Sequence, residues 1–317
     1  MVGLGARGVS VVGVSADDTT VADAPVAVIG AGLDLGAGRR GVDMGPSAIR
    51  YAGLHERVES LGRACLDWGD VQVPVPEATD EGDPQARYLA PIKASCERVA
   101  ALVQEARAQR FVPLVLGGDH SIAIGTLGGM ANAHGPGGVL WIDAHGDLNR
   151  PQTSPTGNVH GMPLAAALGV ATPAFASHAW PTPSVVRAAL VGTRSLDRGE
   201  REILRGLDVR VFTMSEIDRG GVERALREAL EFVRGSSFVH VSLDLDAVDP
   251  MFAPGVGTPV RGGLSYREAH LALELVCESS LMDSLELVEV NPILDRENET
   301  AALAVELAAS ALGARIL

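Results

Sequence analysis

The sequence predicts an α/β domain of three layers, in which helices cover both faces of a central, mainly parallel sheet. Short apolar segments alternate along the chain with longer segments whose apolar residues recur at helical spacing, and this alternation is typical of parallel sheets. The middle of the 317-residue chain contains no linker rich in Pro, Gly or Ser, and no internal repeat is found. We therefore predict a single domain over residues 25–317, preceded by a flexible extension over residues 1–24.

The order of the elements follows from the apolar patterns. Residues 25–30 form the first expected strand, a glycine-rich loop follows, and Pro46 occupies an early position of a helix, where proline is well tolerated. Residues 91–110 carry apolar side chains at helical spacing and predict an amphipathic helix. Further strands are expected at residues 111–116, 139–142, 187–191, 209–212, 238–243 and 284–290, with helices between them, for example at 223–234 and 266–277.

Composition narrows the classes of function. Hydrophobic residues make up 46% of the chain, which is ample for a large core, and the formal net charge is −14. Such a charge repels nucleic acids and anionic membranes, and no apolar stretch of 18 or more residues predicts a membrane-spanning helix. The three cysteines are too few and too scattered for a disulfide framework. We therefore expect a cytoplasmic protein with no nucleic-acid partner and no membrane association.

The glycine-rich loop invites comparison with a dinucleotide-binding fingerprint. Gly36, Gly38, Gly41 and Gly45 follow the first expected strand, but their spacing differs from that of the fingerprint, and charged residues crowd the loop. Dinucleotide binding is therefore not expected.

Six side chains suited to a hard divalent metal occur in three short clusters, and each cluster follows an apolar segment. If those segments are parallel strands, all three clusters lie at strand carboxyl ends, where open α/β sheets bind their ligands. An extended chain would also place alternate residues of each cluster on one side. The six candidate ligands are His120, Asp143, His145, Asp147, Asp244 and Asp246.

The charges of this set predict two metal ions. Four carboxylates converging on one place would repel one another strongly without cations, and two divalent ions balance them. Mixed carboxylate and imidazole ligands suit manganese, iron or zinc better than calcium, and the absence of thiolates argues against a structural zinc site. Two ions ~3.5–4 Å apart can activate a bridging water for hydrolysis. The alternative is that these polar groups are only caps and loop hydrogen bonds.

Several motifs together resemble a known family. They are residues 39–46 (RRGVDMGP), 117–121 (GGDHS), 143–147 (DAHGD), 242–246 (SLDLD) and 255–259 (GVGTP). From about Pro25 to the C-terminus, the chain resembles the ureohydrolases and, within them, the arginases. Residues 154–161 resemble the arginase loop that binds the amino-acid end of the substrate, and residues 191–200 resemble the segment that meets its α-amino group. Thr156 stands where a serine is usual in that loop.

The resemblance implies an activity and a cofactor. It implies two Mn²⁺ ions per subunit, hydrolysis of L-arginine to L-ornithine and urea, and assembly into homo-oligomers, usually trimers or hexamers. One ion would take His120, Asp143, Asp147 and Asp244, and the other would take His145, Asp143, Asp244 and Asp246. Two alternatives stay open: another guanidino compound as substrate, such as agmatine or guanidinobutyrate, or a non-catalytic metal-binding regulatory protein.

The resemblance also implies roles for residues outside the metal set. Glu289 would pair with the substrate guanidinium, with Thr258 hydrogen bonding nearby. Asp147 would carry a proton to the departing amine, and His160 would shuttle protons to bulk water. The expected contacts to the α-carboxylate are Asn149, Ser154, Thr156 and Asn158, and those to the α-ammonium are Asp197 and Glu200.

Overall fold

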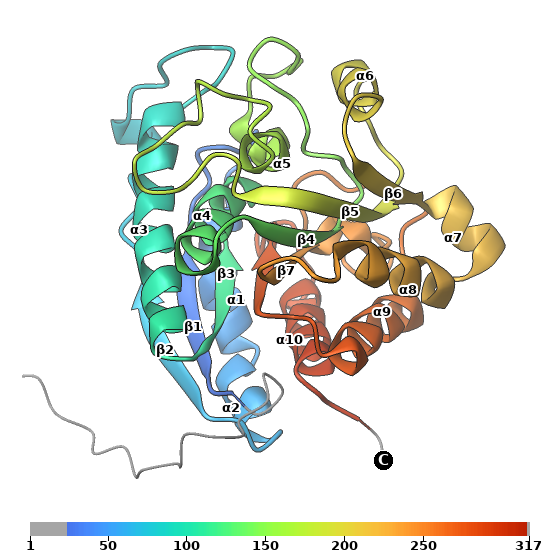
Figure 1. Ribbon diagram of the computed structural model, residues 1–317. Coiled ribbons are helices and arrows are strands. Elements are labelled where there is room, and N and C mark those ends of the chain that lie inside the picture. Colours follow the sequence, from blue (N-terminus) through green and yellow to red (C-terminus); the bar gives the residue numbers. More distant parts are fainter. Residues whose placement is uncertain (1–23, 316–317) are drawn as a thin grey trace, which may run out of the picture.

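Eight parallel strands form one sheet in the computed structural model, which describes residues 24–315 (Figure 1). The strand order is β2-β1-β3-β8-β7-β4-β5-β6, and every pair of neighbours runs parallel. The strands are β1 (Val26–Ala31), β2 (Cys65–Asp70), β3 (Val112–Gly117), β4 (Gly137–Ile142), β5 (Val185–Thr193), β6 (Val209–Thr213), β7 (Val239–Asp244) and β8 (Ser284–Val288).

Helices cover both faces of this sheet. Helices α3, α4 and α5 pack on one face, and α1, α2, α7, α8, α9 and α10 pack on the other (Figure 1). The α-helices are α1 (Gly45–Tyr51), α2 (Leu54–Glu59), α3 (Leu89–Ala108), α4 (Ala123–His134), α5 (Pro163–Ala167), α6 (Arg198–Leu204), α7 (Met214–Gly220), α8 (Val222–Val233), α9 (Tyr266–Ser279) and α10 (Glu299–Ala311). Short 3-10 helices are η1 (Val42–Met44), η2 (Pro76–Ala78), η3 (His120–Ile122), η4 (Val159–Gly161) and η5 (Leu245–Ala247).

Strand β4 shows why the sheet is buried on both sides. Leu140 and Ile142 belong to the apolar cluster under α8 and α9, whereas Val139 and Trp141 belong to the cluster under α3 and α4. All four side chains are fully buried, as the twofold alternation of a central strand requires. The predicted three-layer α/β/α architecture is therefore confirmed.

The predicted strands occur with ends shifted by one or two residues, but several elements were given no predicted range, among them β2, α4 and α10. Strand β2 lies at the edge of the sheet, and its charged, largely exposed residues give no apolar run. Helix α4 is buried around its whole circumference and contains three glycines, so it shows no amphipathic period. Helix α10 is likewise buried on nearly every side.

The strand order places four loops together at the centre of the sheet. Strands β3, β8, β7 and β4 are consecutive neighbours, although they are far apart in the sequence. Their carboxyl ends precede His120, Glu289, Asp246 and the segment that begins at Asp143. In an open α/β sheet this is the region where a ligand binds.

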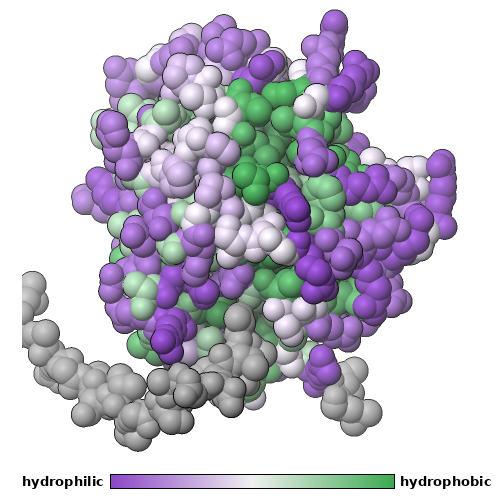
Figure 2. All heavy atoms as spheres, viewed as in Figure 1, coloured by the Kyte–Doolittle hydropathy of each residue, from purple (hydrophilic) through white to green (hydrophobic). Residues whose placement is uncertain are grey.

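The surface is mainly hydrophilic on the face drawn in Figure 2, as expected for a chain with many charged residues. Figure 2 also shows a hydrophobic area over β5. Within residues 24–315, no helix combines the length and the apolar character needed to cross a membrane. The predicted N-terminal extension lies almost wholly outside the described residues.

Candidate metal centre and substrate pocket

His120 lies at the centre of a ring of carboxylates. Its Nδ1 atom is 3.2 Å from Oδ2 of Asp143, 3.1 Å from Oδ2 of Asp147 and 3.2 Å from Oδ2 of Asp244. Nδ1 is buried, yet none of these contacts has the geometry of a hydrogen bond. Three carboxylate oxygens that surround one imidazole nitrogen without hydrogen bonding to it are an arrangement suited to metal ligands.

A second group of ligands lies beside the first. His145 Nδ1 is 3.0 Å from Asp246 Oδ2 and 3.5 Å from Asp143 Oδ1. One ligand atom each from His145, Asp143 and Asp246 lie within 4.8 Å of one another, and the same holds for His120, Asp143 and Asp147. Asp143 therefore presents one oxygen to each group. Asp244 belongs to neither of these two groups, so a bridging role for Asp244 stays a prediction.

The electrostatics of this cluster favour a bound cation. Burial, together with Asp246 and Asp143, raises the pKa of Asp244 well above its usual range. Burial and Asp143 raise the pKa of Asp147 to about 6. Carboxylates that resist ionisation because they are buried side by side gain most from positive charge between them. Oxygen and imidazole ligands without thiolate fit a manganese, iron or zinc ion.

Turns, rather than extended chain, bring the ligands together. Residues 143–147 do not continue the extended chain, because β4 ends at Ile142 and the following segment bends. The His145 N–H donates to Asp143 Oδ1 at 2.6 Å, and Asp147 adopts a left-handed backbone with φ of 51°. Glu289 is also left-handed, with φ of 65°. Such backbone strain in non-glycine residues tends to occur at functional sites.

A pocket of about 260 Å³ opens above the cluster. It brings together every residue predicted to contact substrate or to move a proton, whereas Asp143 and Asp246 are not among its lining residues. The polar lining residues are His120, His145, Asp147, Asn149, Ser154, Thr156, Asn158, His160, Ser195, Asp197, Glu200, Asp244, Thr258 and Glu289.

Glu289 lines the pocket, and one of its carboxylate oxygens is not engaged by the described residues. Its side chain is 1% exposed, and Oε1 accepts from the His120 backbone N–H at 3.0 Å and lies 2.9 Å from His160 Nδ1. Oε2 is buried and has no hydrogen-bond partner among the described residues. Burial opposes ionisation, but the nearby His160 holds the pKa of Glu289 below its usual range. An ionised carboxylate with one open oxygen is suited to a cationic ligand.

The predicted contacts for the amino-acid end are arranged around two loops. Asn149 Nδ2 donates to Asp197 Oδ2 at 2.8 Å, which joins the two loops. Ser154 Oγ accepts from the Gly157 N–H, and Thr156 Oγ1 accepts from the Asn158 N–H, so both hydroxyl protons stay available to a ligand.

Glu200 and Thr258, two further predicted substrate contacts, also bond to other groups of the protein. Both carboxylate oxygens of Glu200 accept backbone N–H groups, from Leu148 at 3.1 Å and from Asp197 at 2.7 Å. Glu200 thus fixes the segment that carries Asp197. Thr258 Oγ1 donates to Asp246 Oδ2 at 3.2 Å, which places its hydroxyl beside the ligand cluster.

Sequence reasoning missed several residues that support the site. The buried carboxylate of Asp119 accepts from the backbone N–H groups of Gly36 and Ser121 and so ties the glycine-rich loop to η3. Its place beside His120 in the GGDHS motif was the available signal. Arg194 donates to four backbone carbonyls, including that of Asp246 at 2.7 Å. No sequence pattern reveals backbone partners of this kind.

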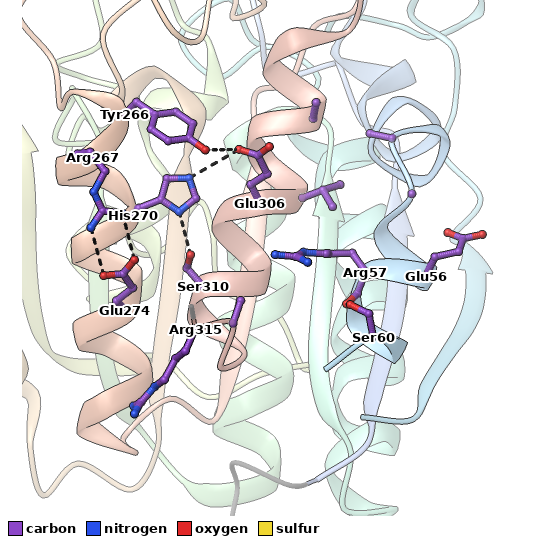
Figure 3. A pocket seen from close by; sticks show the side chains of 15 residues that line it. Glu56, Arg57, Ser60, Tyr266, Arg267, His270, Glu274, Glu306, Ser310 and Arg315 are labelled. Atoms are coloured by element: carbon purple, nitrogen blue, oxygen red, sulfur yellow. Dashed lines mark hydrogen bonds and ion pairs between the residues drawn. The ribbon is translucent and has the colours of Figure 1, made fainter. Parts of the chain in front are cut away.

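A pocket larger than the one above the ligand cluster lies elsewhere in the described part of the chain. A space of about 760 Å³ lies between α2, α9 and α10 and shares no lining residue with the ligand cluster (Figure 3). Within it, His270 pairs with Ser310, and Tyr266 donates to Glu306 at 2.7 Å. Volume therefore does not identify the candidate active site; the convergence of metal ligands does.

The ion pair between His160 and Glu289 predicts a pH-dependent contribution to stability. Burial alone would lower the pKa of His160, but Glu289 raises it to about 9. Because this value exceeds the unfolded value of about 6.5, the stabilisation is complete below that pH and is lost as the pH rises through 9, by about 3 kcal/mol. The measurement is the free energy of unfolding of the metal-free wild type and of metal-free His160→Gln. The difference between the two should fall by about 3 kcal/mol between pH 6 and 10. A pH-independent difference would contradict the pairing.

Comparison with known proteins shows which family this chain resembles over nearly its whole length. The family model described as "Arginase family" matches residues 24–313. The arginase of Bacillus caldovelox is 48% identical over 297 residues, which cover 92% of this chain and 99% of that protein. The arginase of Staphylococcus aureus (strain MSSA476) is 41% identical, over 92% of this chain and 97% of that protein.

Solved structures agree with this placement. The native structure of the B. caldovelox arginase superposes with a TM-score of 0.89 at 47% identity, covering 93% of this chain and all of that one. Proclavaminate amidino hydrolase from Streptomyces clavuligerus has a TM-score of 0.70 at 28% identity, covering 94% of this chain and 96% of that one. With the ligand cluster and the pocket in place, these matches show that the chain belongs to the arginase family.

Proposed function

We propose that this chain hydrolyses L-arginine to L-ornithine and urea, using two Mn²⁺ ions per subunit. One observation carries the proposal: two ligand groups that share Asp143 adjoin a pocket lined by Glu289, whose Oε2 has no hydrogen-bond partner among the described residues. The similarity to arginases over more than nine-tenths of the chain supports arginine as the substrate.

The proposed metal ligands divide into two overlapping sets. His120, Asp143, Asp147 and Asp244 would hold one ion, and His145, Asp143, Asp244 and Asp246 would hold the other. When bound, the pair supplies Lewis acidity and an activated water for attack on a guanidinium carbon.

Glu289 orients the substrate. Its free carboxylate oxygen can accept an N–H of the guanidinium, and a planar carboxylate–guanidinium pair fixes the angle at which the central carbon faces the metal centre. Since Oε1 already accepts the His120 backbone N–H, the carboxylate is held in place before substrate arrives.

Asp147 and His160 are the proposed proton carriers. The amine leaves as ornithine and needs a proton, which Asp147, itself a proposed metal ligand, would accept from the attacking water and deliver. His160 lies in the same pocket, with its side chain 16% exposed, so it can exchange protons with bulk water.

The amino-acid end of the substrate is proposed to bind at the mouth of the pocket. Asn149, Ser154, Thr156 and Asn158 would meet the α-carboxylate through neutral donors. Asp197 would accept from the α-ammonium, and Glu200 would act on the same group, chiefly by holding Asp197.

A panel of guanidino compounds tests the proposal. The purified, Mn²⁺-loaded protein is assayed for urea release from L-arginine, agmatine and guanidinobutyrate. We expect kcat/KM for L-arginine to exceed that for agmatine by at least about 100-fold, because agmatine leaves the donors around Ser154 without a carboxylate. Preference for agmatine or guanidinobutyrate would favour the alternative substrates, and absence of urea from all three would favour a non-catalytic, metal-binding protein.

The setting of the enzyme is also proposed. We infer a cytoplasmic protein, because Cys65, Cys96 and Cys277 are free thiols. Assembly as a homo-oligomer, a trimer or a hexamer, is supported by the resemblance to arginases, and sedimentation equilibrium measures it directly.

A further inference from the structure

A row of buried polar side chains crosses the sheet beneath the proposed metal centre. In the pairing of β7 with β8, Ser242 lies opposite Glu286, and His240 lies opposite Ser284. All four residues are 0% exposed. Burying a carboxylate and an imidazole in the middle of an apolar sheet is costly, and apolar residues would pack there at least as well. The row therefore calls for an explanation other than packing.

Hydrogen bonds connect this row to His120. Ser242 Oγ donates to Glu286 Oε1 at 2.7 Å, and the same Oγ lies 2.7 Å from His120 Nε2. On the far side, His240 Nε2 lies 3.3 Å from Glu286 Oε1, and His240 Nδ1 lies 2.8 Å from Ser284 Oγ. Glu286 thus lies between two histidines: its Oε1 is 3.9 Å from His120 Nε2, and the Ser242 hydroxyl bridges the two groups by hydrogen bonds.

The carboxylate fixes the direction of these bonds. A carboxylate only accepts hydrogen bonds, so the single hydroxyl proton of Ser242 is committed to Glu286. The Ser242 oxygen must then accept from His120, which requires a proton on Nε2 of that ring. A neutral imidazole with its proton on Nε2 carries its lone pair on Nδ1. Nδ1 is the atom that faces Asp143, Asp147 and Asp244.

Trp141 fixes the plane of the same ring. The indole stacks on the His120 imidazole with a centroid distance of 4.1 Å and an angle of 6°. Stacking determines the plane but leaves open which nitrogen carries the proton. That choice falls to the hydrogen bond at Nε2.

We propose that Glu286, acting through Ser242, is a positioning residue that holds His120 in the tautomer whose Nδ1 lone pair binds the metal. The inference rests on the proposed function, because it requires His120 to be a metal ligand. It extends that function into the sheet, to a residue that contacts neither metal nor substrate. Mutation of residues that hydrogen bond to a metal ligand commonly lowers metal affinity by about 10- to 100-fold.

Mn²⁺ binding to the full chain tests the proposal, with free Mn²⁺ measured by electron paramagnetic resonance. Glu286→Leu should lower the affinity of one of the two ions by roughly 10- to 100-fold. Without its acceptor, the Ser242 hydroxyl can donate to His120 Nε2 and stabilise the wrong tautomer. Ser242→Ala removes the connection from its other end and should weaken the same ion.

Two comparisons separate positioning from a general structural role. The double variant Ser242→Ala/Glu286→Leu should bind Mn²⁺ no more weakly than Glu286→Leu alone. Both changes break the same hydrogen-bond relay, which runs from Glu286 through Ser242 to His120. Ser284→Ala is the matched control: it also truncates a buried serine that pairs with a histidine ring, but that ring is His240. Its Mn²⁺ affinity should equal that of the wild type.

The outcomes distinguish this inference from the proposed function. If the wild type binds two ions and Ser242→Ala binds them equally well, the relay is wrong while the proposed function stands. Additive losses in the double variant, or an equal loss in Ser284→Ala, would also overturn it. If Glu286→Leu does not fold, as judged by circular dichroism, the pair Ser242→Ala and Ser284→Ala decides. A wild type that binds no Mn²⁺ removes the proposed function and the relay with it.

Discussion

Replacing Asp246 with alanine is expected to remove one of the two metal ions and to reduce turnover by roughly 10²- to 10³-fold, the cost of losing a preorganised charge at a reacting centre. Asp246 is 1% exposed, and its Oδ2 lies 3.0 Å from His145 Nδ1. It has no predicted contact with the amino-acid end of the substrate, so KM for L-arginine should change far less than kcat. Metal analysis and steady-state kinetics of the same preparation give both quantities.

Asp249 provides a matched control for that variant. It lies three residues further along the same segment, and its carboxylate accepts from the backbone N–H groups of Met251 and Gly262 instead of facing the ligand cluster. Asp249→Ala should therefore retain two ions per chain. Full metal content with normal turnover in Asp246→Ala would refute its place in the metal centre.

Replacing Glu289 with glutamine should lower kcat/KM for L-arginine by roughly 10²- to 10³-fold. The change keeps the shape of the side chain but removes the charge that meets the guanidinium, and losing one member of a buried charge pair costs about 2–5 kcal/mol. Glu289 contacts His120 only through the backbone N–H, so the variant should still bind two Mn²⁺ ions. Wild-type kcat/KM in a metal-loaded Glu289→Gln protein would show that the guanidinium binds elsewhere.

The sequence predicted the site as well as it did because chemistry is concentrated at strand ends. His120, Asp143 and Asp244 each follow an apolar run, and parallel strands bring such positions to one edge of the sheet. The pocket residues were found differently, because an isolated Asn158 or Asp197 in a loop carries no signal without the family resemblance.

Other features depend on pairings that no local pattern contains. The contact of Ser242 with Glu286 needs the register of β7 on β8, two strands separated by a helix. Arg194 acts through backbone carbonyls, which every residue possesses. The left-handed backbone at Asp147 and Glu289 also went unpredicted, because non-glycine residues rarely adopt it and only the folded surroundings impose it.

The account depends most on a pair of metal ions held by the six converging His and Asp side chains. Titration of Mn²⁺ into the chelator-treated, metal-free chain, with urea release from L-arginine measured at each step, tests this directly. We predict no activity without metal, and maximal activity when two ions are bound per chain. Undiminished urea release after exhaustive chelation, or maximal activity with a single bound ion, would contradict it.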